Sequence, residues 1–198
     1  TLFWGAGATL QFIVLKWAET ALNMNLSQGA ILQAISAIGV AGGAVWAASR
    51  IPLKSALNVL PYGVVMGLLV CVMAIYHIEY IPSIVLFELG DFKLNFNLLP
   101  AYLLLITVGW LAGYFVVPMN ALLQHRGHVL LSAGHSIAVQ NFNENLSILV
   151  MLLVYALLIW LDVPVPIVIT CFGLGVALTM WLVIKKHQAN QAEYDSLH

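Results

Sequence analysis

Residues 63–70 read Gly63-Val64-Val65-Met66-Gly67-Leu68-Leu69-Val70, with an apolar or small side chain at every position. A transmembrane β-strand would instead alternate apolar with polar side chains over about ten residues. A helix places no such demand on the sequence, and it satisfies its own backbone hydrogen bonds inside a lipid bilayer. The run therefore predicts a buried or membrane-spanning helix.

The composition of the whole chain indicates a membrane protein. Of its 198 residues, 62% are hydrophobic and only 8% are charged, whereas about a quarter of a typical soluble domain is charged. The seven basic and eight acidic residues cannot cover a water-soluble surface of this size. We therefore expect an integral membrane protein, and the net charge of −1 argues against a nucleic-acid partner.

Six stretches are long and apolar enough to cross a membrane, which takes about 20 residues. They are residues 1–22, 29–49, 60–78, 99–123, 133–161 and 164–185. The sequence thus predicts an all-α, polytopic membrane helix bundle over residues 1–186, followed by a polar, partly disordered cytoplasmic tail over residues 187–198. The long connection over residues 79–97 divides the six spans into two groups of three.

Basic residues orient the predicted helices. Only Lys93 lies on one side of the bundle, and five others lie on the opposite side: Arg50, Lys54, Arg126, Lys185 and Lys186. Because Lys and Arg concentrate on the cytoplasmic side, we expect the C-terminus in the cytoplasm and residues 79–97 on the outer side. Charged residues interrupt that connection, so we expect a short helix or hairpin there instead of another span.

The first span carries the seventh basic residue. Lys16 and Glu19 lie three residues apart and share a helix face with Phe12. Charge inside a membrane costs several kcal/mol unless it is paired or wetted. Two interpretations are open: a mutual ion pair that fixes helix packing, or the wall of a cavity that binds a charged substrate group. Counted from Leu26, Lys16 is expected about 15 Å from the outer end, near the middle of the hydrocarbon core.

The second, fourth and fifth spans also carry polar or aromatic side chains at helical spacing, whereas the third and sixth are nearly featureless and suit the outside of a bundle. The candidate cavity residues on these spans are Gln33, Trp110, Tyr114, Gln140, Asn143 and Glu144. For the amides of the fifth span the alternative role is hydrogen bonding between helices. For Trp110 the alternative is packing, which is also the expected role of Gly109 and Gly113.

The sequence contains no motif for enzymatic chemistry. It lacks a phosphate-binding Walker loop, a nucleophile elbow and a His-Glu-x-x-His stretch. His125 and His128 are remote from the apolar surroundings of Cys71 and Cys171, a spacing that fits no zinc site. We therefore expect neither an enzyme nor a bound metal or cofactor.

Two long stretches resemble a known family. They read Pro118-Met119-Asn120-Ala121-Leu122-Leu123-Gln124 and Ser132-Ala133-Gly134-His135-Ser136-Ile137-Ala138-Val139-Gln140-Asn141-Phe142-Asn143-Glu144-Asn145. Together they resemble the bacterial lysophospholipid transporters of the major facilitator superfamily, with this chain as the C-terminal six-helix half. The resemblance implies a flippase that moves lysophospholipids, chiefly lysophosphatidylethanolamine, from the outer to the inner leaflet of the bacterial inner membrane. It also implies two partners, an N-terminal six-helix half and an acyltransferase/acyl-carrier-protein synthetase that reacylates the lipid.

The resemblance also implies roles for individual residues. Residues 43–54 are similar to the glycine-and-basic loop motif of the superfamily and keep its basic residues, Arg50 and Lys54, as gating candidates, although the motif's Asp and second Gly are missing. In the superfamily the first and fourth spans of each half line the cavity. Lys16 would then bind the lipid phosphate, and Glu19 or Glu144 the ethanolamine ammonium. The candidates for contact with the acyl chain are Phe12, Trp17, Trp110 and Tyr114.

Two other functions are compatible with the same residues. One is a facilitator for a small polar solute or drug, which needs a closed and wetter cavity. The other is a non-transporting membrane scaffold, in which the intramembrane charges are purely structural. Competition by lipid distinguishes the first from lipid transport, and neutral replacement of the charges distinguishes the second.

Overall fold

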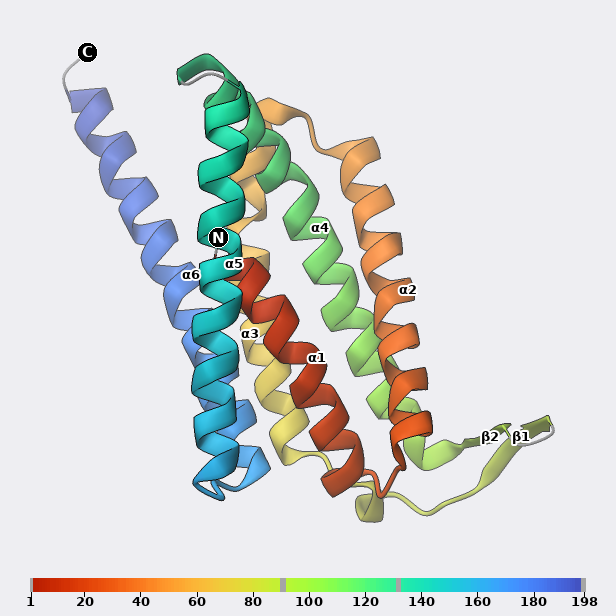
Figure 1. Ribbon diagram of the computed structural model, residues 1–198. Helices are drawn as coiled ribbons and strands as arrows, with labels where there is room; N and C mark the ends of the chain where they lie inside the picture. Colours follow the sequence, from red (N-terminus) through yellow and green to blue (C-terminus); the bar gives the residue numbers. More distant parts are fainter. Residues whose placement is uncertain (1, 90–91, 131–132, 197–198) are drawn as a thin grey trace.

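The computed structural model describes residues 2–89, 92–130 and 133–196. Within these ranges the long helices are α1 (Leu2–Ala21), α2 (Leu26–Arg50), α3 (Leu60–Ile75), α4 (Leu99–Leu130), α5 (Ala133–Trp160) and α6 (Val165–Ser196). They run up and down in one bundle (Figure 1), which confirms the predicted all-α membrane fold. Five of the described helical segments are long and apolar enough to cross a membrane, so the chain is a multi-pass membrane protein.

Short elements connect the long helices. They are the 3-10 turns η1 (Leu53–Val59), η2 (Ile78–Tyr80) and η3 (Phe96–Leu98), and the strands β1 (Val85–Leu89) and β2 (Phe92–Asn95), which pair as an antiparallel hairpin. The Tyr76 hydroxyl donates to the Asn97 carbonyl and so ties η3 to the end of α3. The expected short helix or hairpin between the third and fourth spans is therefore a hairpin flanked by two 3-10 turns.

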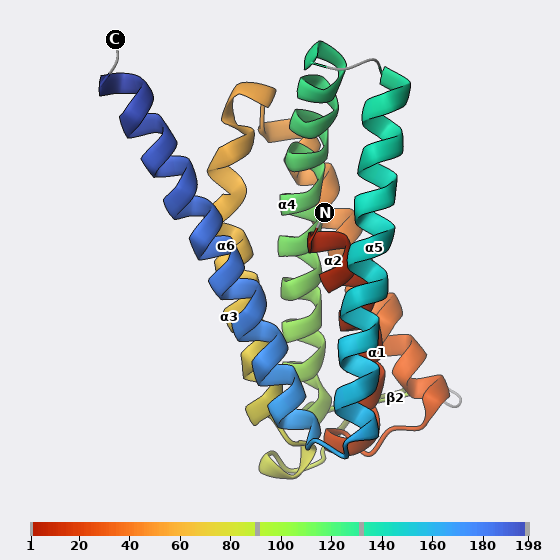
Figure 2. The ribbon, with the colours of Figure 1, turned by 60° about the vertical axis from the view of Figure 1, so that its left-hand side comes forward.

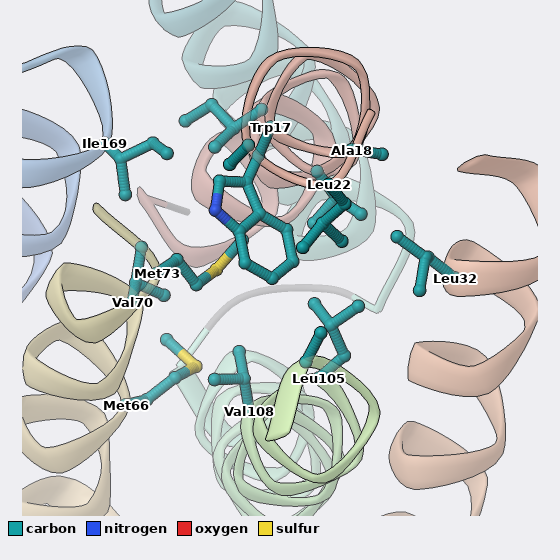
Figure 3. Packing of buried hydrophobic residues seen from close by; sticks show 14 of the residues in the cluster. Trp17, Ala18, Leu22, Leu32, Met66, Val70, Met73, Leu105, Val108 and Ile169 are labelled. Atoms are coloured by element: carbon teal, nitrogen blue, oxygen red, sulfur yellow. The ribbon is translucent and has the colours of Figure 1, made fainter. Parts of the chain in front are cut away.

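α1 packs into the core of the bundle although it is not among the five described helices that are apolar enough to cross a membrane. One face of α1 is fully buried through Ile13, Trp17 and Leu22. Figure 3 shows the Trp17 ring among side chains of α3 and α4, including Met73 and Leu105. This face joins α1 to the core, while the opposite face carries the charged residues.

α1 ends at Ala21, within one residue of the predicted end of the first span but well before Leu26, from which the depth of Lys16 was counted. Asn23 adopts a φ of 52°, in the left-handed region that Asn tolerates better than most residues, and the chain reverses there. Asn25 then begins α2 with a capping box, in which the Asn25 and Gln28 side chains bond each other's backbone N–H groups. The expected depth of Lys16 was therefore wrong: Lys16 lies five residues before Ala21, about 8 Å from the end of its helix.

The C-terminal segment also differs from expectation. α6 continues as a helix to Ser196, so the expected partly disordered tail is helical as far as the structure describes it. The apolar pattern ends near Ile184, but the following Gln, Ala, Lys and Glu residues are good helix formers. Helix propensity therefore extends α6 beyond the apolar span.

Glycines bring two pairs of helices into close contact. Gly39 and Gly43 of α2 face Gly109 and Gly113 of α4, and a Cβ atom added to any of the four would overlap a backbone carbonyl of the facing helix. Small residues spaced four apart allow such close approach in membrane helices. The predicted packing role of the α4 glycines is confirmed, and α3 and α6 meet in the same way at Gly67 and Gly173.

Candidate functional site

Lys16 and Glu19 form an ion pair at one end of α1. The distance from Lys16 Nζ to Glu19 Oε2 is 2.8 Å, and the two side chains are 37% and 64% exposed. It is the only salt bridge among the residues that the structure describes. Because both side chains are accessible, the ion pair remains available to a ligand.

The pair lies in a hollow beside the turn from α1 to α2. The hollow has a volume of about 570 Å³, and its remaining lining is largely apolar: Phe12, Leu15, Met24, Asn25, Leu26 and Tyr155. We refer to it as the Lys16 hollow. Of the predicted site residues, the structure brings Phe12, Lys16 and Glu19 together here.

Tyr155 of α5 belongs to this site but was not predicted. Its hydroxyl donates to the Phe12 carbonyl at 3.4 Å, and the two rings lie 6.3 Å apart between centroids. The sequence did contain a signal, since Tyr155 follows Glu144 by eleven residues, or three helical turns. It therefore continues the polar face of the fifth span toward the end where Lys16 lies.

The polar residues of α5 form a second cluster. Gln140 Nε2 donates to Glu144 Oε1 at 2.7 Å, and Asn143 lines a hollow of about 450 Å³ with His135 and Phe142. The eleven residues from Glu144 to Tyr155 correspond to about 17 Å along the helix. Of the two carboxylates considered for the ammonium group, Glu19 alone thus lies beside Lys16.

Gln33 lies apart from both the Lys16 hollow and the polar cluster of α5. Its Nε2 donates to the Gln11 carbonyl of α1 at 3.0 Å, and it lines an apolar groove of about 570 Å³ between α1, α2 and α4. Lys16 is not among the residues that line this groove. Gln33 therefore joins α1 to α2 by a hydrogen bond of the kind expected between membrane helices.

The aromatic pair of α4 packs against neighbouring aromatic and small residues. The Trp110 and Tyr114 rings stack with centroids 5.0 Å apart, and Tyr62 of α3 meets Tyr114 edge-on at 5.1 Å. Neither Trp110 nor Tyr114 lines the Lys16 hollow or the Gln33 groove. This arrangement favours the packing interpretation of Trp110.

The gating candidates lie at the other end of the bundle. The Arg50 guanidinium lies over the Trp46 ring of its own helix, 5.1 Å from the centroid, and Lys54 lies in η1. Neither has an acidic partner among the described residues. Among all the residues that the structure describes, no three His, Cys, Asp or Glu side chains lie close enough together to hold a metal ion.

Comparison with curated proteins identifies proteins that are similar to this chain in sequence. The chain is 38% identical over 192 residues to the Lysophospholipid transporter LplT of Escherichia coli O9:H4 (strain HS), an alignment that covers 94% of the chain. The chain is similar to LplT. Two Shigella proteins of the same name, from Shigella boydii serotype 4 and Shigella flexneri serotype 5b, are each 37% identical over 191 residues.

The similarity confirms the resemblance noted from the sequence, but it covers only part of the length of the LplT proteins. The chain spans 43% of the length of these LplT proteins. No protein-family model matches the chain, and no solved structure matches it significantly. The stretches that first suggested the relationship to LplT lie at the end of α4 and the start of α5, at the opposite end of the bundle from the Lys16 hollow (Figure 1).

Proposed function

We propose that this chain is one six-helix half of a transporter that moves lysophospholipids, chiefly lysophosphatidylethanolamine, from the outer to the inner leaflet of the bacterial inner membrane. The observation that carries the proposal is an accessible ion pair in a hollow with apolar walls. A zwitterionic lysophospholipid has the complementary pattern: a phosphate, an ammonium group and one acyl chain. The name of the LplT relatives supports this class of substrate.

In this proposal the two charges of the Lys16 hollow exchange partners when lipid binds. The Lys16 ammonium turns to the phosphate and the Glu19 carboxylate to the ethanolamine ammonium. An exposed ion pair contributes only about 0–1 kcal/mol, so breaking it costs little. Charge-assisted hydrogen bonds to the head group, each about twice as strong as a neutral one, would more than offset that cost.

The distribution of basic residues supports an orientation. The end of α2 with η1, the end of α4 and the end of α6 lie at one end of the bundle (Figure 1), and these segments carry five of the seven basic residues. We infer that this end is cytoplasmic. The Lys16 hollow is then at the outer end, where a lipid arriving from the outer leaflet would enter.

Two partners belong to the proposal. No residue in the most apolar stretch of α5 is buried within the described bundle, and the LplT relatives are more than twice as long as this chain. Both observations support an N-terminal six-helix half that packs against this one. Lysophospholipid delivered to the inner leaflet would be reacylated by an acyltransferase/acyl-carrier-protein synthetase.

The proposal is tested with the full-length protein in vesicles that carry fluorescent lysophosphatidylethanolamine. We expect the labelled lipid to change leaflets faster than in protein-free vesicles. Unlabelled lysophosphatidylethanolamine should compete, and small polar solutes should not. Equal rates with and without the protein would contradict lipid transport, and competition by a polar solute alone would favour a solute facilitator.

A further inference from the structure

A second, apolar space adjoins the Lys16 hollow. It is a crevice of about 270 Å³ between α1, α5 and α6, lined by residues that include Ile13, Val154, Leu158, Val168 and Phe172. Figures 1 and 2 both show α5 and α6 close together near their connection and diverging toward their other ends. Val154 of α5 and Cys171 of α6 line the crevice and are exposed, so the crevice opens at the surface of the described bundle.

One polar group inside the crevice has no partner. Four other threonines donate their hydroxyl to the carbonyl four residues earlier in the helix: Thr20, Thr107, Thr170 and Thr179. Thr9 is only 2% exposed and lines the crevice, but its Oγ1 has no hydrogen-bond partner among the described residues. A buried polar atom without a partner is costly, so this hydroxyl is free to bond a ligand.

The crevice and the Lys16 hollow meet at Tyr155, which lines both. Thr9 and Lys16 are seven residues apart on α1, which corresponds to about 10 Å along the helix axis. A charged site and an apolar slot that contains one unpartnered hydroxyl thus lie next to each other along the interface between α1 and α5. These groups are complementary to the head group, the acyl chain and the ester linkage of a lysophospholipid.

We propose that the crevice holds the single acyl chain of the transported lipid, and that the Thr9 hydroxyl donates a hydrogen bond to the ester carbonyl that joins the chain to glycerol. This inference rests on the proposed function and adds to it the place of the chain. The opening between α5 and α6 lets the chain enter sideways from the membrane while the head group reaches Lys16.

The Thr9 bond is tested with two lipids that differ in one carbonyl group. The full-length protein should transport ester-linked lysophosphatidylethanolamine faster than the ether-linked analogue with the same chain. Thr9→Val, which keeps the side-chain shape, should lower transport of the ester lipid roughly two- to tenfold, the effect of one hydrogen bond, and leave the ether lipid unchanged. A Thr9→Val protein that retains the wild-type preference would overturn the assignment of Thr9.

The crevice itself is tested by filling it. Gly175 lines the crevice, and a Cβ atom added there meets no other atom within 4 Å, so Gly175→Leu should fold. We expect this variant to slow transport of a palmitoyl lysophospholipid more than tenfold and to spare a hexanoyl one. Gly134→Leu, at a helical glycine that is equally unobstructed and outside the crevice, is the matched control.

The outcomes separate this inference from the proposed function. A wild-type protein that moves no lysophospholipid would overturn both. A wild-type protein that moves lysophospholipid, with Gly175→Leu as active on palmitoyl lipid as Gly134→Leu, would overturn the crevice alone. A photoreactive group at the end of the acyl chain should crosslink to α5 or α6 residues of the crevice, and crosslinks confined to α2 and α4 would also overturn it.

Discussion

Replacing Lys16 with alanine in the full-length protein is expected to lower lysophospholipid transport by roughly ten- to a hundredfold, because a charge-assisted hydrogen bond of about 1.5–3 kcal/mol is lost. Lys16→Arg keeps the charge and should retain part of the activity. Membrane insertion should be unaffected, because Glu19 is 64% exposed and loses only an accessible partner. The measurement is the leaflet-to-leaflet transfer rate of labelled lysophosphatidylethanolamine at equal protein content.

Lys186→Ala provides the control for loss of a positive charge, since Lys186 lies at the opposite end of the bundle in the extension of α6. It should transport at the wild-type rate. Normal transport by Lys16→Met would show that the charge serves neither substrate nor gating. The scaffold interpretation, in which the ion pair is only structural, would then regain support.

Gly43→Ala is expected to destabilise the protein by about 1–3 kcal/mol, the usual cost of overpacking. The added methyl group would overlap the Trp110 carbonyl, and a backbone carbonyl cannot move aside unless α2 and α4 separate. The measurement is the unfolding midpoint of the purified protein in detergent. Gly113→Ala should behave in the same way, because its methyl group would meet the Val40 carbonyl.

Gly42→Ala is the matched control for this prediction. Gly42 is the adjacent residue on the same helix, and a Cβ atom there would lie 3.7 Å from Trp110 Cδ1, an ordinary van der Waals distance. The two variants therefore add the same methyl group to the same helix and differ only in what it meets. Equal stability of Gly42→Ala and Gly43→Ala would contradict close α2–α4 packing.

Much of the fold was predictable because membrane helices depend on local properties. Apolar length and the absence of alternation located the six helices, and the charges of residues 79–97 excluded a seventh span. The depth of Lys16 was misjudged because it was counted from Leu26, which belongs to α2, whereas the turn at Asn23 and the capping box of Asn25 and Gln28 separate α1 from α2. That capping pattern is visible in the sequence and would have corrected the error.

The site was only partly predictable, because it depends on how helices are placed against one another. The spacing of Lys16 and Glu19 within one helix predicted their ion pair, which the structure confirms. No spacing reveals that Glu144 lies a long way along α5 from Lys16, or that Trp110 faces Gly42 instead of the Lys16 hollow. Those relations follow from the glycine contacts between helices, which bring particular faces together.

The pairing of Lys16 with Glu19 has an electrical consequence. The site carries no net charge, and neither does lysophosphatidylethanolamine, the substrate we propose, so passage of this lipid with the site would itself move no net charge across the bilayer. Moving one elementary charge through 100 mV changes the free energy by about 2.3 kcal/mol, a contribution that vanishes for the zwitterion. A lysophospholipid with an anionic head group would have to enter against the negative interior of the cell at that cost. In the proposed function, the membrane potential would therefore neither drive nor oppose the transfer of the zwitterionic lipid itself.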